Sequence, residues 1–156
     1  MANAAAARAK VTELFPAAKV VCSAVPEVPG TRRVEDVRDA HALNDVDIGV
    51  VRSPLGVAEA GAVWLTQDSL VVNALGVLSQ HLIVLLDPAD IVINLHHAYR
   101  RPEFRERRYA AFHTGPSATA DIEGVLIHGA QGVRSLSVLP VAHATGRSTQ
   151  SLETPA

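Results

Sequence analysis

Short apolar runs alternate with polar or amphipathic segments along most of the chain. The clearest run is His81–Leu86, whose length suits a buried strand. Residues 46–51 are also apolar apart from Asp47, which is typical of a strand inside a parallel sheet. Further extended segments are predicted at residues 19–22, 56–66, 109–113 and 134–141.

Helical periodicity or capping residues mark four further segments. Ala4–Leu14 precedes Pro16, and residues 34–43 place apolar side chains at helical intervals. A helix is predicted from Pro88 to residue 100, with Asp87 as its cap, and another over residues 117–128. Residues 70–79 are compatible with either a strand or a helix.

From residue 46 onward the predicted strands and helices alternate. This order predicts an α/β fold with a mostly parallel sheet and helices on both faces. The length of 156 residues fits one domain. We expect residues 1–44 to form a helical and strand extension, residues 45–141 the core, and residues 142–156 a flexible tail.

The charge balance argues against nucleic-acid or membrane partners. The net charge is −2 and the sequence pI is about 6.4, so no strong attraction to anionic surfaces is expected. No apolar run approaches the roughly 18 residues that a membrane-spanning helix needs. Cys22 is the single cysteine, which excludes an intrachain disulfide and an all-cysteine metal or iron–sulfur site in this chain. A cytoplasmic location is consistent with these features.

One segment combines several features of an anion site. Gly115 permits close backbone approach, and Ser117 or Thr119 can cap the predicted helix. Free N–H groups at a helix start bind anions, but Asp121 would repel a bare phosphate. A ligand with hydroxyl or cationic groups therefore fits better, while an ordinary turn with a cap explains the same residues without a ligand.

Two other side chains could contribute chemistry. Glu59 lies in an apolar, glycine-containing segment, where burial would raise its pKa and make it a candidate nucleophile; it could equally face solvent at a sheet edge. His81 could line the same site as Gly115 or make a structural hydrogen bond. The histidines show no metalloprotease spacing, and we expect no metal site. Nucleotide-binding and hydrolase signatures are also missing from the sequence.

The order of several motifs resembles the LUD domain, the family of lactate-utilisation protein C. Residues 115–123, Gly-Pro-Ser-Ala-Thr-Ala-Asp-Ile-Glu, are followed at 129–132 by Gly-Ala-Gln-Gly, and together they resemble the closing signature of the family. Residues 47–49 and 58–61 resemble its strand and the Ala-Glu-Thr-Gly-Thr motif that follows. His81 falls at the family's Pro-x-x-His, and the resemblance covers about residues 45–139.

The resemblance implies a three-layer α/β/α sandwich of the NagB/RpiA/CoA-transferase type. It also implies a role with two iron–sulfur partner proteins in oxidising L-lactate to pyruvate. Because this chain has one cysteine, any cluster would belong to those partners, and we expect no cofactor in the chain itself. Ala60 and Ala62 replace family threonines, Ser79 stands near a family proline, and the N-terminal region is shorter than is usual in the family.

The leading hypothesis is an accessory LUD-domain protein that binds a small anionic or nucleotide-like ligand. The candidate contacts are Glu59, His81, Gly115, Ser117, Thr119 and Asp121. One alternative is an acyl- or CoA-transferase that uses Glu59 as its nucleophile. Another is a non-catalytic interaction module that docks through the arginines of residues 100–108. A homo-oligomer is compatible with each of these hypotheses.

Overall fold

The computed structural model describes residues 3–104, 109–117 and 132–143. The helix predicted at 117–128 lies outside this part of the chain beyond its first residue, and so does nearly all of the predicted tail. The other predicted elements can be compared with the structure directly.

A five-stranded parallel sheet forms the centre of the fold, which confirms the predicted α/β class. Its strands lie in the order β2-β1-β3-β6-β9, and every neighbouring pair is parallel. Their bounds are Arg32–Arg33 for β2, Val21–Ser23 for β1, Ile48–Ser53 for β3, His81–Leu86 for β6 and Ser135–Pro140 for β9. The first 44 residues therefore supply two strands of this sheet.

A second, four-stranded sheet has the order β7-β4-β5-β8. Its strands are Ile91–Val92 for β7, Leu55–Val57 for β4, Ala62–Thr66 for β5 and Ala110–His113 for β8. The sequence pattern predicted one extended segment over residues 56–66, whereas the chain turns at residues 58–61 and pairs β4 with β5 antiparallel. Gly61 makes this turn possible because its φ is +57°.

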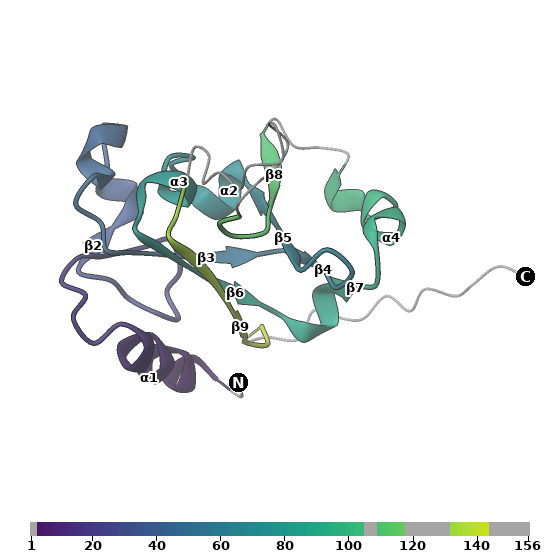
Figure 1. The fold of residues 1–156 in the computed structure, drawn as a ribbon, viewed down its shortest axis with the longest axis horizontal. Helices are drawn as coiled ribbons and strands as arrows, with labels where there is room; N and C mark the ends of the chain where they lie inside the picture. The colour runs from purple at the N-terminus through teal and green to yellow at the C-terminus, as the bar shows by residue number, and fades with distance from the viewer. Residues whose placement is uncertain (1–2, 105–108, 118–131, 144–156) are drawn as a thin grey trace, which may run out of the picture.

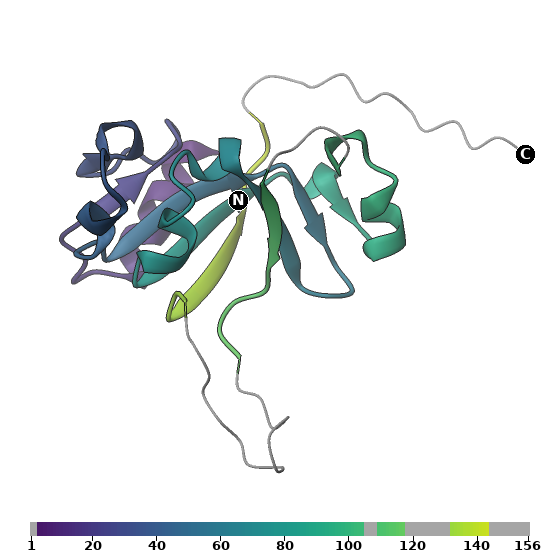
Figure 2. The same cartoon turned by 90° about the horizontal axis from the view of Figure 1, so that it is seen from above.

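Helices and the second sheet cover the two faces of the parallel sheet. Figure 1 shows α1 (Ala4–Leu14) on one side, with α2 (Gln67–Leu70), α3 (Leu75–Leu78) and β8 on the other. The helix α4 (Leu95–Tyr99) lies with the second sheet at the right of Figure 2. The result is a three-layer arrangement around a mostly parallel sheet.

The alternation of side chains along β6 separates two parts of the core. Ile83 and Leu85 pack in the cluster that contains Ala7 and Val11 of α1. Leu82, Val84 and Leu86 pack in the opposite cluster with residues of α2, α3 and β5. Since successive strand residues face opposite sides, His81 shares the face of Ile83.

Two predicted helices are wrong in their extent. Residues 34–43 form two short 3-10 turns, η1 (Val34–Asp36) and η2 (Ala40–Leu43), because Asp39 accepts the N–H of His41 and caps the second turn separately. After the predicted Asp87 cap, the turn η3 (Pro88–Asp90) ends as Ile91–Val92 pair with β4. A new cap, Asn94, then begins α4, which is followed by the turn η4 (Pro102–Phe104).

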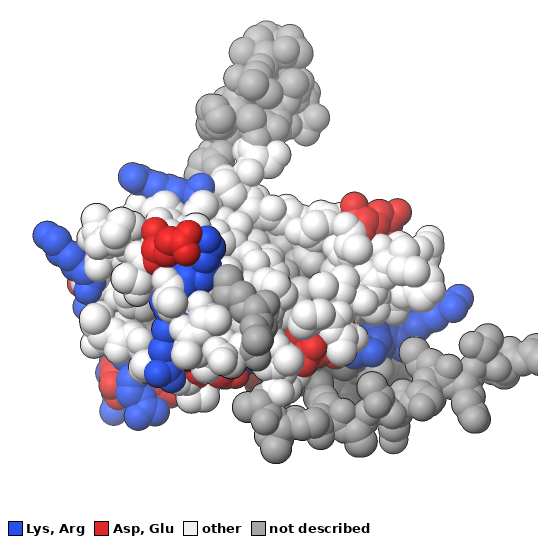
Figure 3. Space-filling model, turned by 90° about the horizontal axis from the view of Figure 1, so that it is seen from below, with Lys and Arg blue, Asp and Glu red and all other residues white. Residues whose placement is uncertain are grey.

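Within the described residues, no helix combines the length and apolar character that a membrane crossing requires. On the face seen in Figure 3, acidic and basic side chains gather in small mixed groups between uncharged areas. This face therefore presents no single extended basic field.

Candidate functional site

A hollow lies where the chain leaves β8, at the segment that the sequence analysis singled out. Gly115 has a φ of +88°, a conformation that favours glycine, and a Cβ placed on it would lie 3.4 Å from the Cβ of Leu136 in β9. The hollow has a volume of about 380 Å³. Its described lining consists of Val77, Phe112, His113, Thr114, Gly115, Pro116, Ser117, Gly132, Val133 and Leu136.

His113 gives this hollow a titratable group that the sequence analysis did not propose. It is the last residue of β8 and pairs with Val63 of β5, whose side chain belongs to the central core. His113 therefore points toward the space between the two sheets. It lies so close to α3 that a Cβ on Gly76 would be 3.3 Å from the His113 Cε1 atom.

Burial lowers the pKa of His113 below its ordinary value of 6.5. The imidazole is therefore neutral near pH 7, with one nitrogen able to donate a hydrogen bond and the other able to accept one. Side chains alternate along β8, and the pairing of His113 with buried Val63 shows which face His113 belongs to. The sequence could indicate this only if the partner strand were already known.

The chemistry of the described lining is polar but uncharged near pH 7. Ser117 supplies a hydroxyl and the half-buried His113 a neutral ring, whereas Val77, Val133 and Leu136 supply apolar walls. No lysine, arginine or carboxylate belongs to the part of the lining that the structure describes. Hydrogen bonding and apolar contact are therefore the means by which these residues could hold a small molecule.

His81 does not lie among the described residues of this hollow. Its Nδ1 is 2.8 Å from the Oγ of Ser135, and its ring lies 4.4 Å from that of Phe15, centroid to centroid. These contacts lie on the α1 face of the parallel sheet, whereas Leu136 faces the hollow from the other side. The structure thus gives His81 the hydrogen-bonded, packed role that was the alternative interpretation.

Glu59 is also not among the described residues that line this hollow. It is exposed in the turn between β4 and β5, and its N–H donates to the carbonyl oxygen of Ile93, 2.9 Å away, beyond β7. Ser117 follows β8, on the opposite side of β5 in the same sheet. The prediction of a Glu59 in an apolar strand is wrong, because Gly61 allows the chain to turn there. Thr119 and Asp121 lie outside the described residues.

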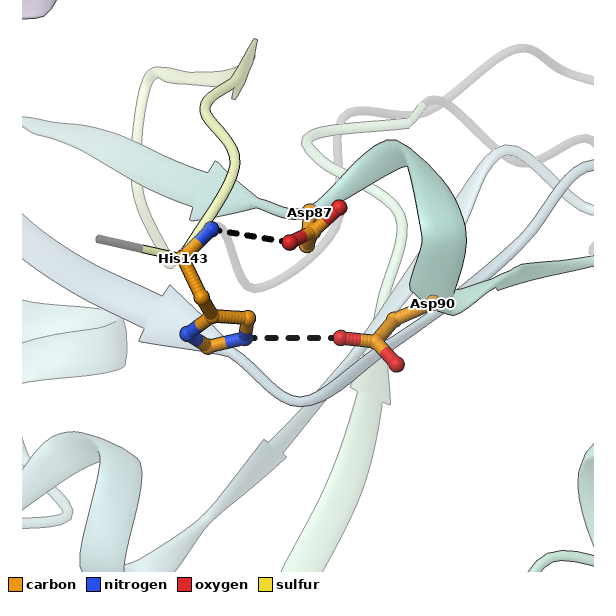
Figure 4. Close-up of side chains that lie close together, drawn as sticks. All are labelled: Asp87, Asp90 and His143. Carbon is orange, nitrogen blue, oxygen red and sulfur yellow. Dashed lines mark hydrogen bonds and ion pairs between the residues drawn. The ribbon is translucent and has the colours of Figure 1, made fainter. Parts of the chain in front are cut away.

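A second group of polar side chains lies at the carboxyl end of the parallel sheet. Asp87 follows β6 and accepts two backbone N–H groups, those of Ala89 at 3.0 Å and His143 at 2.8 Å. These bonds, with the His143 bond the stronger influence, hold the pKa of Asp87 below its ordinary value. Figure 4 shows Asp87, Asp90 and His143 gathered around one point.

Among the described residues, Asp90 forms two ion pairs, one with His143 and one with Arg101. The Asp90 carboxylate lies 3.4 Å from Nε2 of His143 and 3.3 Å from Nη2 of Arg101. Only 12% of the Asp90 side chain is exposed, which distinguishes it from an ordinary surface carboxylate. This group has no local signal in the sequence, because Asp90 and His143 are 53 positions apart and no motif connects them.

Comparison with known proteins agrees with this fold. A family model described as the LUD domain matches residues 2–141. A crystal structure of a DUF162 family protein from Deinococcus radiodurans is similar, with a TM-score of 0.67 and 17% identity over 90% of this chain and 85% of that chain. At that identity the likeness shows the fold alone. A comparison with curated proteins finds no match.

Proposed function

We propose that this chain, which belongs to the LUD domain family, is an accessory protein of lactate or related organic-acid utilisation. In this proposal it binds a small polar ligand, anionic or nucleotide-like, in the hollow at Gly115. The family is linked to lactate utilisation, and that link supports the metabolic setting. The single observation that carries the site is that His113, Gly115 and Ser117 line one hollow.

The residues of the hollow suit a ligand with hydroxyl or carbonyl groups. Neutral His113 can donate to an oxygen or accept from a hydroxyl. Gly115 has no Cβ, so it adopts its positive φ without strain and lets a ligand approach the backbone closely. The apolar walls would face a short carbon skeleton. A nucleotide or CoA ester would need further contacts beyond these residues.

Thermal-shift and calorimetric titrations test this site. We would titrate L-lactate, pyruvate, nucleotides and CoA esters into the wild type and into His113→Phe and Ser117→Ala variants. His41→Phe, which changes an exposed histidine of η2, is the matched control. We expect a ligand that stabilises the wild type and the control but loses at least tenfold in affinity in the two site variants. If every compound that binds does so equally in His113→Phe, the site is wrong.

Iron–sulfur proteins of lactate oxidation are the partners in this proposal. Co-purification from cells that co-express such proteins would support the pathway assignment, and it should persist in Ser117→Ala if docking and ligand binding use different residues. A variant without Arg100 and Arg101 tests the docking segment that the sequence suggested. The Glu59 side chain is exposed and does not belong to the described lining of the hollow, which does not favour acyl transfer through this residue.

A further inference from the structure

The ends of β6 and β9 bring together three side chains that can each donate one atom to a metal ion. Asp87 directly follows β6, Asp90 ends the turn η3, and His143 comes three residues after β9. One carboxylate oxygen from each aspartate and one imidazole nitrogen all lie within 4.8 Å of one another. In open parallel sheets, ligands bind beyond the carboxyl ends of the strands, and this group has that position.

The Nε2 atom of His143 has an ion-pair contact but no hydrogen bond among the described residues. It is buried and has no hydrogen-bond partner in the described part of the chain. Oδ2 of Asp90 lies 3.4 Å from this nitrogen, a long ion-pair contact, and no hydrogen bond joins the two atoms (Figure 4). Buried polar atoms are normally satisfied, and an exception in a group of potential ligands indicates an ion or a water molecule.

The two aspartates keep the capacity to accept a cation. Each oxygen of Asp87 accepts one backbone N–H, and a carboxylate has about four lone-pair sites in all. Asp90 is held in place from the other side by Arg101, so the carboxylate that faces His143 is already oriented.

We propose that Asp87, Asp90 and His143 bind a divalent transition-metal ion such as Mn²⁺ or Zn²⁺. Two carboxylate oxygens and one imidazole nitrogen suit these ions, whereas Ca²⁺ and Mg²⁺ prefer all-oxygen sites. Ligand bonds of about 2.0–2.2 Å require the three atoms to move slightly closer than their present spacing. This site lies at the opposite end of the parallel sheet from the Gly115 hollow and does not depend on the proposed function.

Two guanidinium groups will moderate the affinity. Arg101 contacts Asp90 directly, and the positive charge of Arg52 also acts on Asp87. Both repel a cation, so the site should be weaker than one with the same ligands and no arginine nearby. Arg101→Gln should therefore tighten ion binding several-fold, an effect that a purely structural ion-pair network would not produce.

Titration of the full chain without a histidine tag, after treatment with a chelator, tests the proposal. Free Mn²⁺ is measured by electron paramagnetic resonance in the wild type, Asp90→Asn, His143→Gln and the control His41→Gln. We expect one ion per wild-type chain, an affinity at least tenfold lower in the first two variants and no change in the control. Circular dichroism checks that each variant folds.

Electron spin-echo spectra of the wild-type Mn²⁺ complex give a second measurement that needs no variant. A coordinated imidazole produces a ¹⁴N coupling, which we expect to see. The proposal is overturned if no stoichiometric binding occurs, if the ¹⁴N coupling is missing, or if His143→Gln binds as tightly as the wild type. Equal affinity for Ca²⁺ and Mn²⁺ would also overturn it, since it would indicate an all-oxygen site.

Discussion

Arg52, near the end of β3, donates a hydrogen bond of 3.0 Å from Nη1 to the carbonyl oxygen of Val141. The same guanidinium forms an ion pair with Glu27, whose carboxylate oxygen lies 2.8 Å from Nη2. One side chain thus connects the loop after β1 with the segment that leads to His143. The exposed fractions are 14% for Arg52 and 20% for Glu27, so this pair is largely shielded from water.

Replacement of Arg52 by Met should therefore be costly. It leaves the Glu27 carboxylate without its partner in a mostly buried position, and we expect a loss of about 2–3 kcal/mol in the free energy of unfolding. Urea denaturation measures the change. Arg33→Met is the control, because Arg33 is 76% exposed in its pair with Glu35 and should cost less than about 0.5 kcal/mol. Similar losses in the two variants would contradict the structure.

The buried His113 predicts a pH dependence of stability. Because its pKa is lower in the folded state than the ordinary 6.5, the unfolded chain binds more protons between those two pKa values. Stability from this group is complete above about pH 6.5 and is lost as the pH falls through the folded pKa. The melting temperature of the wild type should fall from pH 7 to 5 more than that of His113→Gln.

Titration of the His113 ring by NMR gives a direct check of the same prediction. A midpoint below 6.5 is expected, and a midpoint at or above that value would show that the ring is not desolvated. His41→Gln, an exposed histidine variant, should leave the pH dependence of the melting temperature as it is in the wild type.

Gly115 and Gly61 form a matched pair for separating backbone strain from a binding role. Both have positive φ, +88° and +57°, and neither has crowded surroundings for a Cβ. Each change to Ala should therefore cost about 1–2 kcal/mol of stability, from the backbone conformation. Only Gly115→Ala should also weaken the stabilisation by a ligand found in the titrations above. Equal ligand responses of the two variants would remove Gly115 from the site.

The parts of the fold that could be predicted are those in which local pattern and tertiary structure agree. Ala4–Leu14 and His81–Leu86 have the bounds that their sequence predicts. The helix expected after Pro88 fails because tertiary pairing prevails over local capping: Ile91–Val92 add a strand to β4, and Asn94 begins a new helix. Nothing near Pro88 in the sequence identifies β4 as the partner.

The same limit applies to the sites. Gly115 and Ser117 could be proposed from their local chemistry, and the structure places both at one hollow. His113 joins them through strand pairing, and Asp90 meets His143 across 53 residues, so neither relationship has a local signal. The apolar sequence around Glu59 left a buried and a solvent-facing carboxylate equally open, and the structure has this side chain exposed in a turn.

Protonation of Asp47 should make the fold less stable in acid. Its Oδ2 accepts the N–H groups of Lys19, at 2.7 Å, and Val20, at 2.9 Å, and so ties the start of β1 to β3. These bonds, that to Val20 first, lower the pKa of Asp47 below its ordinary value of 3.8. The carboxylate therefore stabilises the fold fully above that value, and the contribution is lost as the pH falls through the folded pKa.

We expect Asp47→Asn to cost about 1 kcal/mol at pH 7, because a neutral amide oxygen accepts these bonds less strongly than a carboxylate. The difference from the wild type should shrink as the pH falls from 3.8 through the lower folded pKa, since the wild-type side chain then becomes neutral as well. Urea denaturation across this range measures it, with Asp36→Asn, an exposed position in η1, as the control. A difference that stays constant with pH would mean that the amide disturbs packing and that the charge of Asp47 contributes nothing.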